Sequence, residues 1–307
     1  MMTSLPTSCG FIAVIGLPNA GKSTLINALV GQKVSIVSKR AQTTRCRILG
    51  IALHDTPDTS AQMIFIDTPG VFEAKKMMER AMVGAAFDAL EEADAILHVV
   101  DVSQKNTLAR NEDIIKKIET LASAKRPVFL ALNKIDCIAK EALLDFTAQF
   151  NARFDYAQTF MISALKENGL SALQDKIANA LPAGPWHYEA DEITDMPMRM
   201  MAAEITREKI FHQLHEELPY AALVETEEWE HFDNGDIRIG QCIYVQRDSQ
   251  KAIVLGKGGS RIKKLGEAAR KDLQDILQCR VHLKLFIRVR EDWPEKAESL
   301  RIMGLDP

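Results

Sequence analysis

Short apolar runs alternate with amphipathic stretches along residues 10–181. The apolar runs are GFIAVIG, RILGIAL, QMIFID, AILHVVD, PVFLALNK and QTFMIS, and helix-like segments such as MERAMVGAAFDALEEA and NEDIIKKIETLA lie between them. Strands that are apolar on both faces indicate a sheet covered by helices on both sides. The alternation therefore predicts an α/β domain with a doubly wound, mostly parallel sheet. The second and third runs are joined by HDTPDTSA, which is too short for a crossover helix, so we expect an antiparallel hairpin there.

The pattern changes after residue 181. The segment PAGPWHYEADEITDMP combines prolines with acidic residues, which is typical of a linker between domains. The long helical stretch MRMMAAEITREKIFHQLHEELP follows it, and a polar–apolar alternation around the turn DNG then predicts a β-hairpin. The strand-like HLKLFIRVR ends near residue 290. We therefore predict a first domain over 10–181, a linker over 182–197, an α+β domain over 198–290 and a partly helical tail over 291–307.

Composition places the chain among ordinary soluble globular proteins. It has 307 residues, 26% charged and 47% apolar, with a net charge of −4, and this length allows two domains with separate cores. The scattered cysteines form no C-x-x-C pair, so we expect reduced thiols rather than a zinc site or disulfides. The N-terminus lacks the pattern of a signal peptide, and no apolar run approaches the roughly 18 residues of a membrane span. We therefore expect a cytoplasmic protein.

The first chemical motif is GLPNAGKST, between the strand FIAVI and the helical LINALV. It matches G-x-x-x-x-G-K-[ST], a loop whose backbone N–H groups surround phosphate oxygens at a helix N-terminus. The lysine can reach the β- and γ-phosphates, and the serine hydroxyl can ligate Mg²⁺. The motif predicts a nucleotide site made by Gly16, Pro18, Asn19, Ala20, Gly21, Lys22, Ser23 and Thr24.

A second motif, DTPG, ends the apolar run QMIFI. A carboxylate at the C-terminal end of a strand faces the crevice in which open α/β sheets bind ligands. Asp67 can hold Mg²⁺ through a water molecule, because Mg²⁺ keeps several of its waters. The backbone N–H of Gly70 can contact a γ-phosphate.

A third motif, NKID, follows the strand VFLAL and selects the base. Guanine presents two adjacent donors, N1–H and the 2-amino group, and the carboxylate of Asp136 can accept both. Adenine lacks this pair and would leave the carboxylate unpaired. We expect Asn133 to tie the loop to the phosphate cradle and the Lys134 stem to lie over the base. The later SAL segment, Ser163, Ala164 and Leu165, adds a backbone N–H near the guanine oxygen. The nucleotide is predicted to be GTP or GDP.

These segments, together with GQKVSIVSKRAQTTRCRILGI, DTPGVFEAKKMMERAM and SALKENGL, resemble the GTPase domain of the Era family of bacterial ribosome-assembly GTPases. The resemblance covers residues 10–181. It implies that QTTR is switch I, which orders over the γ-phosphate and Mg²⁺, with Thr44 as the favoured switch residue and Thr43 as the other candidate. The catalytic set is then Lys22, Thr44 and Gly70, and the metal set is Ser23, Thr44 and Asp67.

Two positions bear on hydrolysis. Ras-type switches place a water-orienting Gln after the DxxG motif. This chain has Val71 there, as Era-like GTPases do, so we expect slow intrinsic hydrolysis. Related GTPases with Asn at the position of Asn19 use it to help hold K⁺. A loop-stabilising role for Asn19 is the alternative.

A fourth motif is GKGG, within LGKGGSRIKKLGEAARKDLQDILQ. A G-x-x-G loop followed by a basic amphipathic helix and a strand resembles a type II KH domain, whose loop clamps single-stranded nucleotides. Between residues 247 and 290 there are 12 Lys plus Arg against 4 Asp plus Glu, a local net charge of about +8. The predicted RNA-binding residues are Gly256, Lys257, Gly258, Gly259, Arg261, Lys263 and Lys264.

The residues around this loop leave some choices open. Periodicity predicts that KAIVL, before the GKGG, is a strand, whereas the KH resemblance implies a short helix. We favour the helix, because periodicity cannot distinguish a strand from a helix in so short an apolar run. Ile253, Val254 and Ile262 can read unstacked bases. Core packing is the alternative for at least half of them.

The whole chain resembles the Era family. That resemblance implies binding to the 3′ region of 16S ribosomal RNA, association with the 30S subunit during assembly, a monomeric state and peripheral contact with the inner membrane. Two alternatives stay open. One is a GTP-regulated protein for another RNA or for tRNA modification, and the other is a protein-interaction module whose KH domain does not bind RNA.

Overall fold

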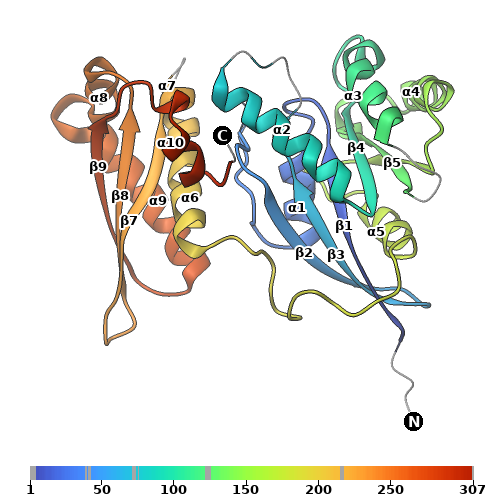
Figure 1. Ribbon diagram of the computed structural model, residues 1–307, viewed down its shortest axis with the longest axis horizontal. Helices are drawn as coiled ribbons and strands as arrows, with labels where there is room; N and C mark the ends of the chain where they lie inside the picture. Colours follow the sequence, from blue (N-terminus) through green and yellow to red (C-terminus); the bar gives the residue numbers. More distant parts are fainter. Residues whose placement is uncertain are drawn as a thin grey trace. The chain divides into compact units, whose positions relative to one another are not determined.

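A computed structural model describes residues 5–38, 40, 43–70, 74, 76–121, 126–214 and 218–305 (Figure 1). Contacts between residues divide the chain into two compact units. The first contains Met1–Ser35, Thr44–Lys75 and Glu79–Asp195, and the second contains Ile36–Thr43, Lys76–Met78 and Met196–Pro307.

The first unit is built on a six-stranded sheet in the order β2-β3-β1-β4-β5-β6. Its strands are β1 (Thr7–Ile15), β2 (Ile48–Asp55), β3 (Ser60–Asp67), β4 (Ala95–Asp101), β5 (Val128–Asn133) and β6 (Gln158–Ile162). All neighbouring pairs are parallel except β2 and β3, which are antiparallel from Ile48 opposite Asp67 to Asp55 opposite Ser60. The predicted doubly wound sheet and its antiparallel hairpin are confirmed.

Helices cover both faces of this sheet. They are α1 (Lys22–Val30), α2 (Met77–Glu92), α3 (Thr107–Leu121), α4 (Lys140–Arg153) and α5 (Leu170–Ala178), with a short 3-10 turn η1 (Ile135–Cys137) after β5. In β1, Ile12 packs in a cluster with residues of α1 and α5, whereas its neighbour Ala13 packs in a cluster with residues of α2, α3 and α4. Because successive strand residues point to opposite faces, both faces of β1 are core. This explains why the strands are apolar throughout.

Residues 182–188 are bound along the first unit. The Cys9 N–H donates to the Pro182 carbonyl at 3.1 Å. The fully buried Gln62 side chain on β3 accepts from the N–H groups of His187 (2.8 Å) and Tyr188 (3.0 Å) and donates to the Tyr188 carbonyl at 2.8 Å. Since these bonds satisfy the polar groups of a buried side chain, this part of the proline-containing segment packs as part of the first unit.

The second unit contains a three-stranded sheet in the order β7-β8-β9. Its elements are α6 (Met198–Gln213), α7 (Leu218–Ala221), β7 (Leu223–His231), β8 (Ile237–Val245), α8 (Asp248–Leu255), η2 (Lys257–Gly259), α9 (Ser260–Leu277), β9 (Val281–Val289), η3 (Trp293–Glu295) and α10 (Ala297–Ile302). Strands β7 and β8 form the predicted antiparallel hairpin, and β9 runs parallel to β8. The KAIVL segment lies in helix α8, as the KH resemblance implied.

The prediction of one continuous helix over residues 198–219 is wrong in its last part. Helix α6 ends at Gln213, and Leu214 has an extended backbone with φ −106° and ψ 156°. A separate short helix begins at Leu218. Pro219 lies in the first turn of that helix, where its missing N–H costs nothing, whereas inside a continuing helix it would remove a hydrogen bond.

The C-terminal tail belongs to the core of the second unit. The Trp293 side chain is fully buried, and its indole N–H donates to the Ala221 carbonyl at 2.9 Å. Leu300 and Met303 are also buried. A buried Trp needs such a partner for its N–H, so the tail has a packing role that the sequence pattern did not reveal.

Helix α6 also holds the segment Ile36–Thr43 within the second unit. A carboxylate oxygen of Glu208 accepts from the Val37 N–H at 3.0 Å, and the Arg207 guanidinium donates to the Thr43 carbonyl at 2.6 Å. The chain thus passes from the second unit to the first between Thr43 and Thr44.

Candidate nucleotide and RNA sites

The phosphate cradle lies between β1 and α1. Gly21, directly before α1, has φ 97°, and a side chain there would place Cβ 2.4 Å from the Asn133 amide nitrogen, so only glycine fits. The buried Lys22 ammonium donates to the carbonyls of Gly16 (3.1 Å) and Leu17 (3.2 Å). Burial lowers the pKa of Lys22 to about 8, against the opposing attraction of Asp67. The predicted cradle residues are thus brought together in one strand–loop–helix turn.

The three predicted metal-site residues meet beside the cradle. The Ser23 hydroxyl donates to Asp67 Oδ2 at 2.7 Å and lies 2.9 Å from the Thr44 hydroxyl, which is 3.2 Å from the same carboxylate oxygen. Asp67 Oδ1 is buried and has no hydrogen-bond partner among the described residues. A carboxylate and two hydroxyls offer oxygen ligands of the kind that Mg²⁺ takes beside nucleotide phosphates. Burial raises the pKa of Asp67, and the nearby Lys22 ammonium opposes that effect.

The geometry also separates the two switch threonines. The Thr43 hydroxyl is engaged with the Ser38 hydroxyl at 2.7 Å and donates to the Arg40 carbonyl at 2.9 Å. The buried Thr44 hydroxyl instead points to Ser23 and Asp67. Of the two threonines, only Thr44 has its hydroxyl in the cluster with Ser23 and Asp67.

The guanine loop is fastened to the cradle through Asn133. Its amide nitrogen donates to the Ala20 carbonyl at 2.8 Å, and its amide oxygen accepts from the Ala164 N–H at 3.0 Å. One carboxylate oxygen of the exposed Asp136 accepts from the Ser163 hydroxyl at 2.6 Å. That bond holds the pKa of Asp136 below its ordinary value. The other carboxylate oxygen accepts from the Cys137 thiol at 3.7 Å, so neighbours on both sides orient the exposed carboxylate.

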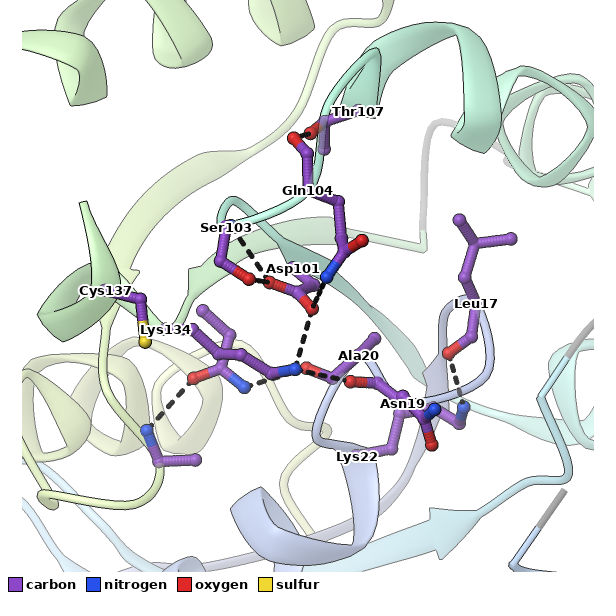
Figure 2. Close-up of polar contacts among 12 residues, drawn as sticks. Leu17, Asn19, Ala20, Lys22, Asp101, Ser103, Gln104, Thr107, Lys134 and Cys137 are labelled. Carbon is purple, nitrogen blue, oxygen red and sulfur yellow. Dashed lines mark hydrogen bonds and ion pairs between the residues drawn. The ribbon is translucent and has the colours of Figure 1, made fainter. Parts of the chain in front are cut away.

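Lys134 forms a second connection between the two loops (Figure 2). Its ammonium donates to the Asn19 carbonyl at 2.8 Å and to an Asp101 carboxylate oxygen at 2.7 Å. Asp101 was not among the residues predicted from the sequence. Its only signal was its place as the last residue of the strand AILHVVD, at the same sheet edge as the other motifs.

The other predicted nucleotide residues surround these groups. The Gly70 backbone packs against the cradle, since a Cβ there would lie 2.8 Å from the Pro18 nitrogen. Thr24 is half-buried in α1, and the Leu165 side chain is 74% exposed. Val71 lies outside the described residues.

The glycine-rich loop of the second unit joins α8 to α9. Gly256 has φ 70° and ψ 173°, a conformation open only to glycine, and a Cβ there would meet the Arg261 side chain at 2.9 Å or less. Lys257, Lys263 and Lys264 are exposed around the loop. Gly258 and Gly259 also have positive φ, and a Cβ on either would meet nothing within 4 Å. The loop therefore presents open backbone and positive charge, which suits a phosphodiester chain.

The three apolar candidates near this loop have different surroundings. Val254 is fully buried in the core of the second unit, so for it the packing alternative holds. Ile253 is 46% exposed, and Ile262 is half-buried. Only the last two are accessible to a base.

Comparisons with known proteins agree with this geometry. The family model described as a 50S ribosome-binding GTPase matches residues 11–134, and the KH domain model matches residues 217–294. The GTPase Era of Sinorhizobium medicae is 50% identical over 303 residues, covering 99% of this chain and 95% of that protein. The chain belongs to the Era family of GTPases. The Era protein of Erythrobacter litoralis is 46% identical over 99% of both chains.

Solved structures of Era proteins share the whole fold. A point variant of Aquifex aeolicus Era, bound to GDP and AlF4⁻, is 37% identical, with a TM-score of 0.88 over 97% of this chain and 99% of that one. A structure of Era with MgGDPNP and nucleotides 1506–1542 of 16S ribosomal RNA has a TM-score of 0.89 at the same identity and coverage. The prediction of an Era-family GTPase domain followed by a KH domain is confirmed.

Proposed function

We propose that this Era-family GTPase binds the 3′ region of small-subunit 16S ribosomal RNA through its KH domain and assists maturation of the 30S subunit. The observation that carries the proposal is the exposed basic loop at Gly256–Gly259. The same chain also brings the guanine-nucleotide motifs together at one edge of the six-stranded sheet. The support from a relative is the 37% identical Era that was solved with a 16S fragment.

Bound Mg²⁺ fits the residues of the nucleotide site. Ser23, Thr44 and Asp67 would hold it, and when bound it would neutralise charge on the β- and γ-phosphates. The Lys22 ammonium, now hydrogen-bonded to cradle carbonyls, would turn to the phosphate oxygens. Asp136 would fix the guanine edge. Catalysis of phosphoryl transfer then rests on positioning and on charge stabilisation.

The chain at Thr43 and Thr44 connects the nucleotide site to the second unit, so the bound nucleotide can influence that unit through these two residues. The Thr44 hydroxyl lies with Ser23 and Asp67, whereas the Thr43 carbonyl accepts from Arg207 on α6. Contacts of Thr44 to the γ-phosphate and Mg²⁺ would form only with GTP bound, so they would favour one arrangement of the segment that α6 holds. The proposal is that RNA affinity depends on the nucleotide.

The expected result is tighter binding of a single-stranded 16S 3′-end oligonucleotide in one nucleotide state, by roughly fivefold or more. Filter binding of the full chain with Mg²⁺ and either a non-hydrolysable GTP analogue or GDP measures it. Thr44→Val removes the hydroxyl at constant shape and should reduce the difference between states, whereas Thr44→Ser should keep it.

Each other outcome contradicts a named part of the proposal. Equal affinity in both states rules out nucleotide control. Equal affinity for a scrambled oligonucleotide favours a protein that acts on another RNA. The absence of RNA binding in both states favours a KH domain that contacts protein.

Intrinsic hydrolysis is expected to be slow, with a single-turnover rate well below the roughly 10 s⁻¹ of stimulated Ras, because Val71 cannot orient water.

The same single-turnover assay in KCl and in NaCl tests the role of Asn19, whose positive φ of 64° also suits a purely structural role. Asn19→Gly keeps that conformation. A higher rate in KCl that Asn19→Gly abolishes indicates K⁺ binding, and equal rates indicate loop stabilisation.

The cytoplasmic location stays a prediction from the sequence composition, and the monomeric state and peripheral contact with the inner membrane stay predictions from the family resemblance. Among the residues that the structure describes, every helix is too short or too polar to cross a membrane.

A further inference from the structure

Asp101 lies at the end of β4, next to the end of β5. The two strands are parallel, with Asp101 opposite Asn133, and the Val102 N–H donates to the Asn133 carbonyl at 3.1 Å. This pairing brings the Asp101 carboxylate beside Lys134, the next residue of the guanine loop. Asp101 is 9% exposed, so its carboxylate is largely removed from water.

Both oxygens of the Asp101 carboxylate are engaged (Figure 2). Oδ2 accepts from the Lys134 ammonium at 2.7 Å and from the Gln104 amide at 3.3 Å. Oδ1 accepts from the Ser103 N–H at 2.9 Å and from the Ser103 hydroxyl at 2.5 Å. Burial by itself raises the pKa of Asp101, but the bonds from Lys134 and Ser103 outweigh it and lower that pKa. The carboxylate is therefore a fixed negative charge.

The Lys134 ammonium connects this charge to the phosphate cradle by donating to the Asn19 carbonyl at 2.8 Å. Lys134 (φ 68°) and Asn19 (φ 64°) are both non-glycine residues in the left-handed region. Asparagine tolerates this conformation, whereas a lysine persists in it only where its surroundings hold it. The ammonium joins the two residues. Without an anion beside it, the flexible lysine side chain would hold its hydrogen bond to Asn19 only in competition with water.

We propose that Asp101 is a positioning residue of the nucleotide site. It holds the Lys134 ammonium in place and thereby keeps the guanine loop and the cradle at Asn19 in the arrangement that binds GTP and GDP. It acts through Lys134, and the described contacts give it no other link to the cradle. The inference deepens the GTP-binding part of the proposed function and does not depend on RNA binding.

The test is the dissociation rate and Kd of a fluorescent GDP analogue on the full chain carrying Asp101→Asn. This variant keeps the shape and an acceptor for Ser103 but removes the charge. The expected result is a roughly tenfold higher Kd, mostly through faster release. The matched control is Gln104→Ala, which removes a weaker partner and leaves the ion pair, so a change below about threefold is expected.

A double-mutant cycle with Lys134→Met separates positioning from simple stabilisation. If Asp101 acts through Lys134, Asp101→Asn should change the Kd little on the Lys134→Met background. Asp101→Glu provides a second variant that keeps the charge but displaces it, and it should also raise the Kd. An unchanged Kd in Asp101→Asn, or additive effects in the cycle, would overturn the proposal. RNA binding in the same variants reports separately on the proposed function.

Discussion

Asp136→Asn should weaken GTP and GDP binding at least about 100-fold. The carboxylate accepts from both N1–H and the 2-amino group of guanine, and each charge-assisted bond contributes about 1.5–3 kcal/mol. Asparagine keeps one acceptor but turns a donor toward the amino group. Xanthine has a carbonyl oxygen in place of that amino group, so xanthosine triphosphate should bind this variant better than GTP does. Competition binding with GTP and xanthosine triphosphate measures this change of preference.

Ser163 provides the matched control, because its hydroxyl orients the Asp136 carboxylate at 2.6 Å without being needed as an acceptor for the base. Ser163→Ala should weaken GTP binding by less than about tenfold, the cost of one hydrogen bond, and should leave the preference for guanine intact. If Asp136→Asn bound GTP as tightly as the unchanged chain, the assignment of base specificity to this carboxylate would be wrong.

Gly258→Asp should weaken RNA binding markedly, while Gly258→Asn should have a much smaller effect. Gly258 has φ 60° and ψ 25°, a left-handed conformation that Asn and Asp tolerate, and a Cβ at this position would meet no atom within 4 Å. The two variants differ mainly by one negative charge beside the RNA backbone. We expect roughly tenfold weaker binding for Asp than for Asn. Titration with the 16S oligonucleotide at fixed salt measures both.

GTP binding provides the internal control for this pair. Gly258 lies in the second unit and the nucleotide residues lie in the first, so both variants should bind GTP normally. Gly256→Ala is the contrasting variant, because its φ 70° and ψ 173° exclude a side chain and should lower the melting temperature. Equal RNA affinities for Gly258→Asp and Gly258→Asn would argue against phosphate contact at this loop.

The sequence by itself determined most of the fold and was enough to predict the chemistry of both sites. The spacing of Lys22, Asp67 and Asp136 predicted a guanine-nucleotide site because each motif follows an apolar run, and the carboxyl ends of parallel strands share one sheet edge. The turn-rich HDTPDTSA predicted the antiparallel hairpin because it is too short for a crossover. In both cases the information is local, carried by motif, period and loop length.

The tertiary structure decided what depends on distant neighbours. The family resemblance favoured Thr44 over Thr43, and only the packing gives a physical reason: the Thr44 hydroxyl lies against Asp67, while the Thr43 hydroxyl donates to the Arg40 carbonyl. Trp293 lies in the predicted tail, for which the sequence indicated no role, and it is core. Asp101 looked like an ordinary strand end until strand pairing placed it opposite Asn133, where it holds Lys134. The partner that decides each of these roles lies far away along the chain and comes close only on folding, so no local pattern records it.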